Sequence, residues 1–111
     1  MPFVNFLGKA ERFPMTHPGS ELIDRLYRAT LGLKTPAECA AFFEDLCTIT
    51  EIQNMAQRLG VAQLLAGGRN YQEITNGTGV STATISRVNR CLRYGSGGYR
   101  LALARLGREE R

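Results

Sequence analysis

Apolar residues recur every three or four positions along most of this chain, which is the spacing of one face of an α-helix. The first five periodic runs begin at or just after a residue that caps helices well, and these residues are Ser20, Thr35, Thr48, Asn70 and Ser81. A glutamate follows three residues after Thr35, Thr48 and Asn70, which predicts capping boxes at these starts. Glycines interrupt the pattern between most of the runs. The pattern predicts helices from Ser20 to near Gly32, over 36–46 and 49–66, around Ile74, from the Ser81 cap to about Tyr94, and over 99–106. No segment alternates as a half-buried strand does, so we expect an all-α protein with six helices.

The longest predicted helix, 49–66, is apolar on more than one face, at Ile49, Ile52, Met55, Ala56, Leu59, Ala62, Leu64 and Leu65. Such a helix lies either at the centre of a monomeric core or against a second subunit. Residues 1–19 contain Pro2, Pro14 and Pro18 and show no sustained periodicity. We predict that they form a flexible N-terminal arm and that residues 20–107 form the helical domain.

Residues 71–94 meet the requirements of a helix-turn-helix, in which one helix braces a second at a steep angle. The first helix needs an apolar residue that faces the second, and Ile74 supplies it. The turn between the helices contains Gly77 and Gly79, and Gly79 lies where the chain reverses and accepts an unusual backbone angle. Val80, Ile85 and Val88 provide apolar positions that can hold the second helix against the protein.

The residues that this arrangement leaves outward carry groups that suit DNA. Small and hydroxyl-bearing side chains open the second helix, where they can contact phosphates and base edges: Ser81, Thr82, Ala83, Thr84 and Ser86. Arg87, Arg90 and Arg93 follow, and Gln72 and Thr75 on the first helix are placed to reach a phosphate. Ordinary capping and a solvated arginine face explain each feature alone. Their combination with the apolar framework favours DNA binding by residues 71–94.

The distribution of charge points the same way. The formal net charge is +4, but residues 1–68 carry six Lys or Arg against seven Asp or Glu, whereas residues 69–111 carry eight Arg against three Glu. A basic C-terminal part beside a balanced N-terminal part indicates an anionic partner on one side of the protein.

Other features narrow the class of protein. The composition, 43% hydrophobic and 22% charged, is typical of a soluble globular domain. No apolar stretch reaches the roughly 18 residues of a membrane span, and the start is a poor secretory signal, so we predict no membrane partner and a cytoplasmic location. Cys39, Cys47, Cys91 and the single histidine, His17, lack the number and spacing of a zinc site. We interpret the cysteines as reduced structural thiols and predict no metal and no cofactor.

The chain closely resembles the YerC/YecD branch of the Trp-repressor superfamily. The resemblance rests on residues 56–59, 71–74, 78–88, 91–92 and 94–95, with 42–48 upstream, and covers about residues 20–107. It implies a six-helix Trp-repressor-like fold that forms an intertwined homodimer, in which two helix-turn-helix heads enter successive major grooves of double-stranded DNA. The resemblance therefore implies that the protein is a sequence-specific transcriptional regulator and that it acts as a repressor.

The resemblance departs from the Trp repressor at the amino-acid ligand. Of the two arginines that grip that ligand, one matches Arg87, whereas the other position holds Gln57. A serine that assists the ligand's amine falls on Cys91, and a glycine near the pocket falls on Val88. A clamp on the ligand's carboxylate that lacks one arginine loses a charge-assisted contact. The bulkier Val88 should also fill space that the indole ring of tryptophan would occupy. We therefore do not expect tryptophan to bind, and the sequence leaves any other effector unknown.

Two other functions compete with this interpretation. A protein-interaction module could reuse the same scaffold, but residues 81–87 contain no aromatic residue that would support it. An enzyme would need a catalytic arrangement, yet the predicted domain has no Ser/His/Asp or Cys/His set and no glycine-rich phosphate loop after a strand. We therefore predict that the protein is not an enzyme.

Overall fold

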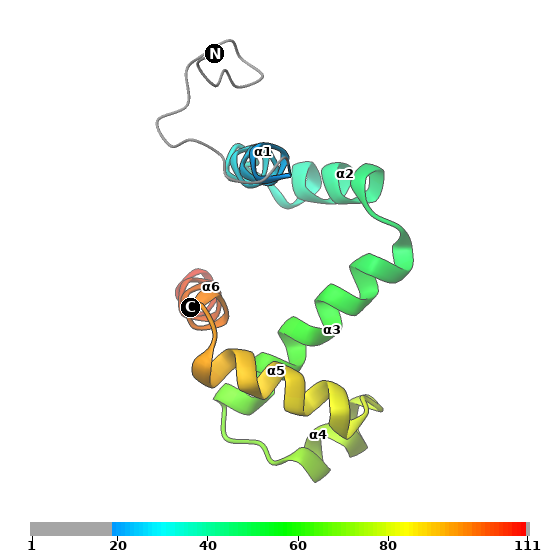
Figure 1. Ribbon diagram of the computed structural model, residues 1–111. Coiled ribbons are helices and arrows are strands. Elements are labelled where there is room, and N and C mark those ends of the chain that lie inside the picture. Colours follow the sequence, from blue (N-terminus) through cyan, green and yellow to red (C-terminus); the bar gives the residue numbers. More distant parts are fainter. Residues whose placement is uncertain (1–18, 111) are drawn as a thin grey trace. The chain divides into compact units, whose positions relative to one another are not determined.

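The computed structural model describes residues 19–110, so nearly all of the predicted arm, together with His17, lies outside the described residues. Between 19 and 110 the chain forms six helices and no strand, which confirms the all-α prediction (Figure 1). The helices are α1 (Ser20–Leu31), α2 (Pro36–Leu46), α3 (Ile49–Ala66), α4 (Tyr71–Thr78), α5 (Thr82–Tyr94) and α6 (Gly98–Glu109).

The chain divides into two compact units, the first ending at Leu46 and the second beginning at Cys47. In the first unit, residues 32–35 join α1 to α2, and the rings of Phe42 and Phe43 meet edge to face with centroids 5.4 Å apart. Neither helix has a buried residue. The apolar face of α1 is open, with Tyr27 63% and Leu31 83% exposed. The described part of this unit therefore has no closed core of its own.

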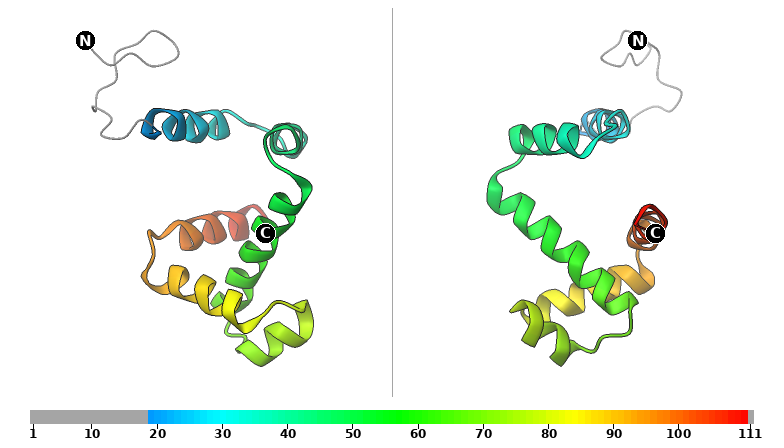
Figure 2. Two further views of the ribbon diagram at one scale, coloured as in Figure 1. Left: turned by 45° about the vertical axis from the view of Figure 1, so that its right-hand side comes forward. Right: turned by 180° about the vertical axis from the view of Figure 1, so that it is seen from behind.

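The second unit is built around α5, which packs against α3, α4 and α6 (Figures 1 and 2). Its core is one apolar cluster with members from α3, α4, the turn and α5: Val61, Ala62, Ile74, Val80, Ile85 and Val88. Tyr71 from α4 and Tyr99 and Leu103 from α6 pack against this cluster. The helix-turn-helix segment is thus held by the C-terminal half of α3 and by α6.

Helix α3 is only partly covered in the single chain. Val61 and Ala62 are fully buried near its C-terminal end. Towards its start, Ile49 is 66% and Met55 37% exposed. Ile49 and Met55 in its first half are therefore exposed, whereas Ile52 between them is half-buried.

Local hydrogen bonds explain why the helices begin where they do. At the start of α3 the Thr48 hydroxyl accepts the Glu51 N–H at 3.1 Å, and the Glu51 carboxylate accepts the Thr48 N–H at 2.8 Å. This capping box satisfies two donors that a helix start otherwise leaves free. Hydrogen bonding with Thr48 lowers the pKa of Glu51 below its ordinary value of 4.5; the backbone N–H of Thr48 has the larger effect and the Thr48 side chain the smaller one.

Four local predictions need correction. Ser20 is the first residue of α1, and the capping position is Gly19, which makes no side-chain cap. Before α2, Thr35 accepts the Glu38 N–H, but the Glu38 carboxylate accepts from the N–H of Lys34 instead of Thr35. Gly77 lies inside α4 and not in the turn, because the hydrogen bonding of α4 continues to Thr78. The last helix is longer than the predicted 99–106 and spans Gly98–Glu109.

The remaining observations concern cysteines and membranes. Cys39 and Cys47 are half-buried and Cys91 is exposed, and all three are free thiols. Among residues 19–110, none of the helices is both long enough and apolar enough to span a bilayer. The same residues contain no cluster of three or more His, Cys, Asp or Glu that could hold a metal ion.

Candidate nucleic-acid interface

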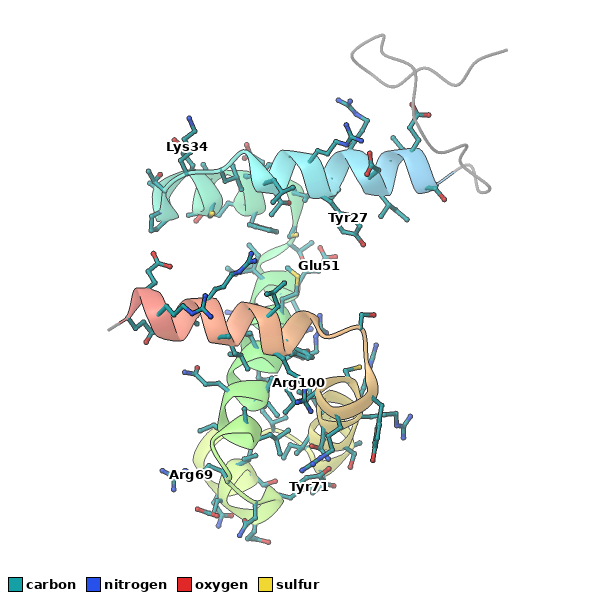
Figure 3. All side chains as sticks on the ribbon, turned by 90° about the vertical axis from the view of Figure 1, so that its left-hand side faces the viewer. Tyr27, Lys34, Glu51, Arg69, Tyr71 and Arg100 are labelled. Carbon is teal, nitrogen blue, oxygen red and sulfur yellow. The ribbon has the colours of Figure 1, made fainter. Side chains whose placement is uncertain are left out.

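The first helix of the candidate interface, α4, begins at a capping box. The Asn70 side chain accepts the Glu73 N–H at 2.9 Å, and the Glu73 carboxylate accepts the Asn70 N–H at 3.2 Å. Arg69 Nη1 lies 3.3 Å from the same carboxylate. Two hydrogen bonds lower the pKa of Glu73 below its ordinary value of 4.5: the bond from the Asn70 backbone N–H has the larger effect, and the bond from the Arg69 side chain has the smaller one. These contacts fix where α4 starts, and Figure 3 shows Arg69 and Tyr71 at this end of the unit.

The turn between α4 and α5 depends on a glycine and a threonine. Gly79 takes the left-handed conformation, with φ +74°, and its N–H donates to the Thr75 carbonyl at 2.8 Å. The Thr78 hydroxyl donates to the Ile74 carbonyl at 2.6 Å and accepts the Val80 N–H at 3.1 Å. Thr78 is a residue that the sequence reasoning missed. A hydroxyl residue directly before the glycine of a turn is the signal that could have found it.

The second helix, α5, is capped by Ser81. The Ser81 hydroxyl accepts the Thr84 N–H at 3.3 Å and donates to the Thr84 hydroxyl at 3.2 Å. Its carbonyl accepts the Ile85 N–H at 3.1 Å, which is the first bond of the helix. The first turn of α5 is thereby held by its own side chains.

One face of α5 is buried. Ile85 is 0% and Val88 1% exposed, and they share the core cluster with Ile74 and Val80. Leu92, a further buried residue, extends the same stripe by one helical turn. The sequence reasoning did not include Leu92 in this set, although its spacing of four from Val88 is the helical signal.

The other face of α5 is exposed and basic. The side chains on it are Ser81, Thr82, Ala83, Ser86, Arg87, Arg90 and Arg93, all of which are exposed. The helix contains no acidic residue. Arg93 Nε donates to Asn89 Oδ1 at 3.0 Å, so its guanidinium is held along the helix. The exposed face therefore presents small hydroxyl groups at its start and positive charge along its length.

Three other candidate residues are either less exposed to solvent or already hydrogen-bonded within the protein. Thr84 is half-buried, and its hydroxyl is bonded to Ser81. Gln72 is exposed, and its amide donates to Asn76 Oδ1 at 3.1 Å. Thr75 is half-buried, and its Oγ1 is buried without a hydrogen-bond partner. In this conformation the Thr75 hydroxyl is shielded from solvent, and a phosphate contact needs a change of rotamer.

Comparisons with known proteins assign this arrangement to a family. The Trp repressor protein family matches residues 21–107. The chain belongs to this family. The Bacillus subtilis (strain 168) protein YerC, described as uncharacterized, is 54% identical over 92 residues, which cover 83% of this chain and 88% of YerC. The resemblance read from the sequence is confirmed.

Solved structures of the family share the fold. The crystal structure of a TrpR-like protein from Eubacterium eligens ATCC 27750 superposes with a TM-score of 0.74 at 50% identity, covering 78% of this chain and 89% of the other. A crystal structure from Staphylococcus aureus gives a TM-score of 0.73 at 42% identity, covering 83% and 96%. The Trp-repressor-like fold is thus established for this chain.

Within this family fold, the positions that depart from the Trp repressor can now be placed. Val88 is 1% exposed and belongs to the core cluster. Gln57 and Cys91 are exposed in the single chain. A valine in the core occupies volume that a glycine at this position would leave open.

Proposed function

We propose that this protein is a sequence-specific regulator of transcription, acting as a repressor, which binds double-stranded DNA as a homodimer through α4 and α5. The observation that carries the proposal is the division of α5 into two faces. Ile85, Val88 and Leu92 anchor one face in the core, and the first turn of the other face is exposed. Membership of the Trp repressor family supports a DNA-binding regulator.

The exposed residues divide into two chemical roles. Thr82, Ala83 and Ser86 are small, so the start of α5 can approach base edges closely, where hydroxyls bond and a methyl packs on thymine. Arg87 and Arg90 lie farther along the helix and suit phosphates, which position the protein without reading sequence. The helix start adds a partial positive charge toward the same backbone.

The open apolar surfaces support the homodimer. Leu22 is 63% and Ile23 50% exposed on α1, and Ile49 is 66% exposed at the start of α3. Exposed apolar surface of this kind is costly in water and marks a contact with another protein. A second copy of the chain is the partner that the family resemblance implies, and its open α1 and α3 would supply a matching apolar surface.

The DNA proposal is tested by selecting bound sequences from a random pool with the full chain. We expect a palindromic consensus, because a twofold dimer reads two half-sites. Ala83→Gln inserts bulk at the exposed start of α5, and we expect it to cost about 1–3 kcal/mol of discrimination between the consensus and random DNA.

Arg90→Ala is the matched control for this experiment. It should weaken binding to both DNAs alike and lower the slope of log K against log salt by about one. An equal loss on both DNAs from Ala83→Gln, or no DNA retained at low salt, would contradict the proposal. Expression of a reporter from a promoter that carries the selected site tests repression, which should depend on intact Ala83.

The dimer is tested by sedimentation equilibrium of the full chain. Leu22→Ser removes an exposed apolar side chain from α1 and should weaken self-association, whereas Glu21→Ser on the polar side of the same helix should not. A wild-type chain that sediments as a monomer at micromolar concentration would refute this part of the proposal.

A further inference from the structure

Arg100, on α6, makes a hydrogen bond that links two helices of the second unit. Its Nε donates to the carbonyl of Leu92 at 2.8 Å. The other side-chain hydrogen bonds within residues 47–110 join positions no more than four apart in the chain, whereas this one joins α6 to α5 (Figure 3). The hydrogen bond thus connects α6 to α5, the helix proposed to contact the DNA bases and called the recognition helix below.

The Leu92 carbonyl is a group that needs such a partner. In a continuous helix it would accept the N–H of residue 96, but α5 ends at Tyr94. The last carbonyls of a helix are left without internal partners, and together they form the negative end of its dipole. The Arg100 guanidinium supplies both a donor and a positive charge at this end. Arg100 therefore caps α5 from outside the helix.

The connection between α5 and α6 is short and tolerates little change. It consists of residues 95–97, and the Gly95 N–H donates to the Cys91 carbonyl at 2.9 Å. A Cβ at Gly95 would lie 2.4 Å from that same oxygen, which is a backbone atom that cannot swing away. Leu92, whose carbonyl Arg100 holds, is itself buried at 8% exposure. The link and the Arg100 bond together restrict how α5 can tilt relative to α6.

We infer that Arg100 is a positioning residue for DNA recognition: by capping α5 from α6 it sets the angle at which the recognition helix is presented, and so the half-site spacing that a dimer reads. This inference rests on the proposed function. Arg100 itself need not touch DNA, because it acts through the Leu92 carbonyl at the end of α5 opposite the exposed first turn.

The test compares Arg100→Met with Arg105→Met in the full chain. Both variants remove one positive charge from α6, but no hydrogen bond is seen for Arg105. Duplexes carry two copies of the selected half-site with the spacer varied one base pair at a time. We expect Arg100→Met to flatten the preference for one spacing and to lose about tenfold in affinity at the best spacing. Arg105→Met should keep the wild-type spacing profile, and Arg100→Lys should restore most of it because it retains a charged donor.

A measurement without DNA separates this inference from the proposed function. Residual dipolar couplings of the backbone amides in α5 and α6 report the relative orientation of the two helices and its fluctuation. Wild type and Arg105→Met should fit one rigid orientation, whereas Arg100→Met should show reduced or reoriented couplings in α5. Couplings and a spacing profile that are the same for Arg100→Met and Arg105→Met would overturn the inference while leaving DNA binding intact. If wild type binds no DNA, the proposed function fails and the role of Arg100 in recognition is overturned with it, whatever the couplings show.

Discussion

Two glycines that lie two positions apart should respond to alanine in opposite directions. Gly77 lies within α4, and a Cβ built there meets nothing within 4 Å. Gly79 has equally open space, but its φ of +74° is a conformation that L-residues avoid. The steric environment is the same at both sites, so the backbone conformation alone decides the sign of the effect.

The magnitudes follow from the two conformations. Alanine inside a helix is favoured over glycine by about 0.5–1 kcal/mol, so Gly77→Ala should stabilise the protein by up to that amount. Placing an L-residue in the left-handed region costs about 1–2 kcal/mol, so Gly79→Ala should destabilise by about that amount. At about 4–8 °C per kcal/mol for a domain of this size, the two midpoints should separate by roughly 10 °C.

The assay is urea and thermal unfolding of both variants beside wild type, followed by circular dichroism at 222 nm. All samples must have the same protein concentration, because the midpoint of an associating protein depends on it. Gly79→Asn is the control, since asparagine tolerates the left-handed region better than alanine and should lose less stability. If Gly77→Ala and Gly79→Ala both destabilise to a similar extent, Gly77 belongs to the turn and the continuation of α4 to Thr78 is wrong.

Three further predictions follow. Ile85→Ala should destabilise by about 2–5 kcal/mol, because it empties a fully buried position in the core cluster; urea unfolding checks this, and a loss below 1 kcal/mol would contradict the packing of α5. Because the pKa of Glu73 is lowered on folding, its carboxyl group loses its proton more readily in the folded protein than in the unfolded chain. The ionised carboxylate therefore stabilises the fold above pH 4.5, and this contribution is lost as the pH falls below that value. Glu73→Gln should therefore flatten the acid side of the stability–pH curve, and a curve identical to wild type would contradict the role of the capping box. Tryptophan should leave the thermal midpoint unchanged even at millimolar concentration, because Gln57 replaces one of the two arginines of the clamp; a rise of several degrees would show that the ligand is retained.

The sequence by itself was sufficient for the elements that depend on neighbours within about one helical turn. The caps at Thr48, Asn70 and Ser81 each use a side chain and an N–H three residues apart, so their pattern can be read directly from the chain. The inward spacing of Ile85 and Val88 is equally local. These short-range signals are the reason that the six helices and the family resemblance were found without a structure.

Short-range signals also produced the local errors. Ser20 has the chemistry of a capping residue, but α1 begins one position earlier, and its start depends on where the backbone turns rather than on an available hydroxyl. Gly77 was predicted to lie in the turn together with Gly79, and glycine is an unfavourable residue inside a helix. The hydrogen bonds of α4 outweigh that preference and carry the helix through Gly77 to Thr78.

Only the tertiary structure decided which surfaces are covered and which groups meet across helices. The sequence shows α3 as apolar on several faces, but its packing against α5 buries Val61 and Ala62 and leaves Ile49 open. The buried Thr75 hydroxyl and the bond from Arg100 to the Leu92 carbonyl have no local signature. Periodicity states which residues can share a face, whereas the identity of the neighbour on that face depends on contacts between segments distant in the chain.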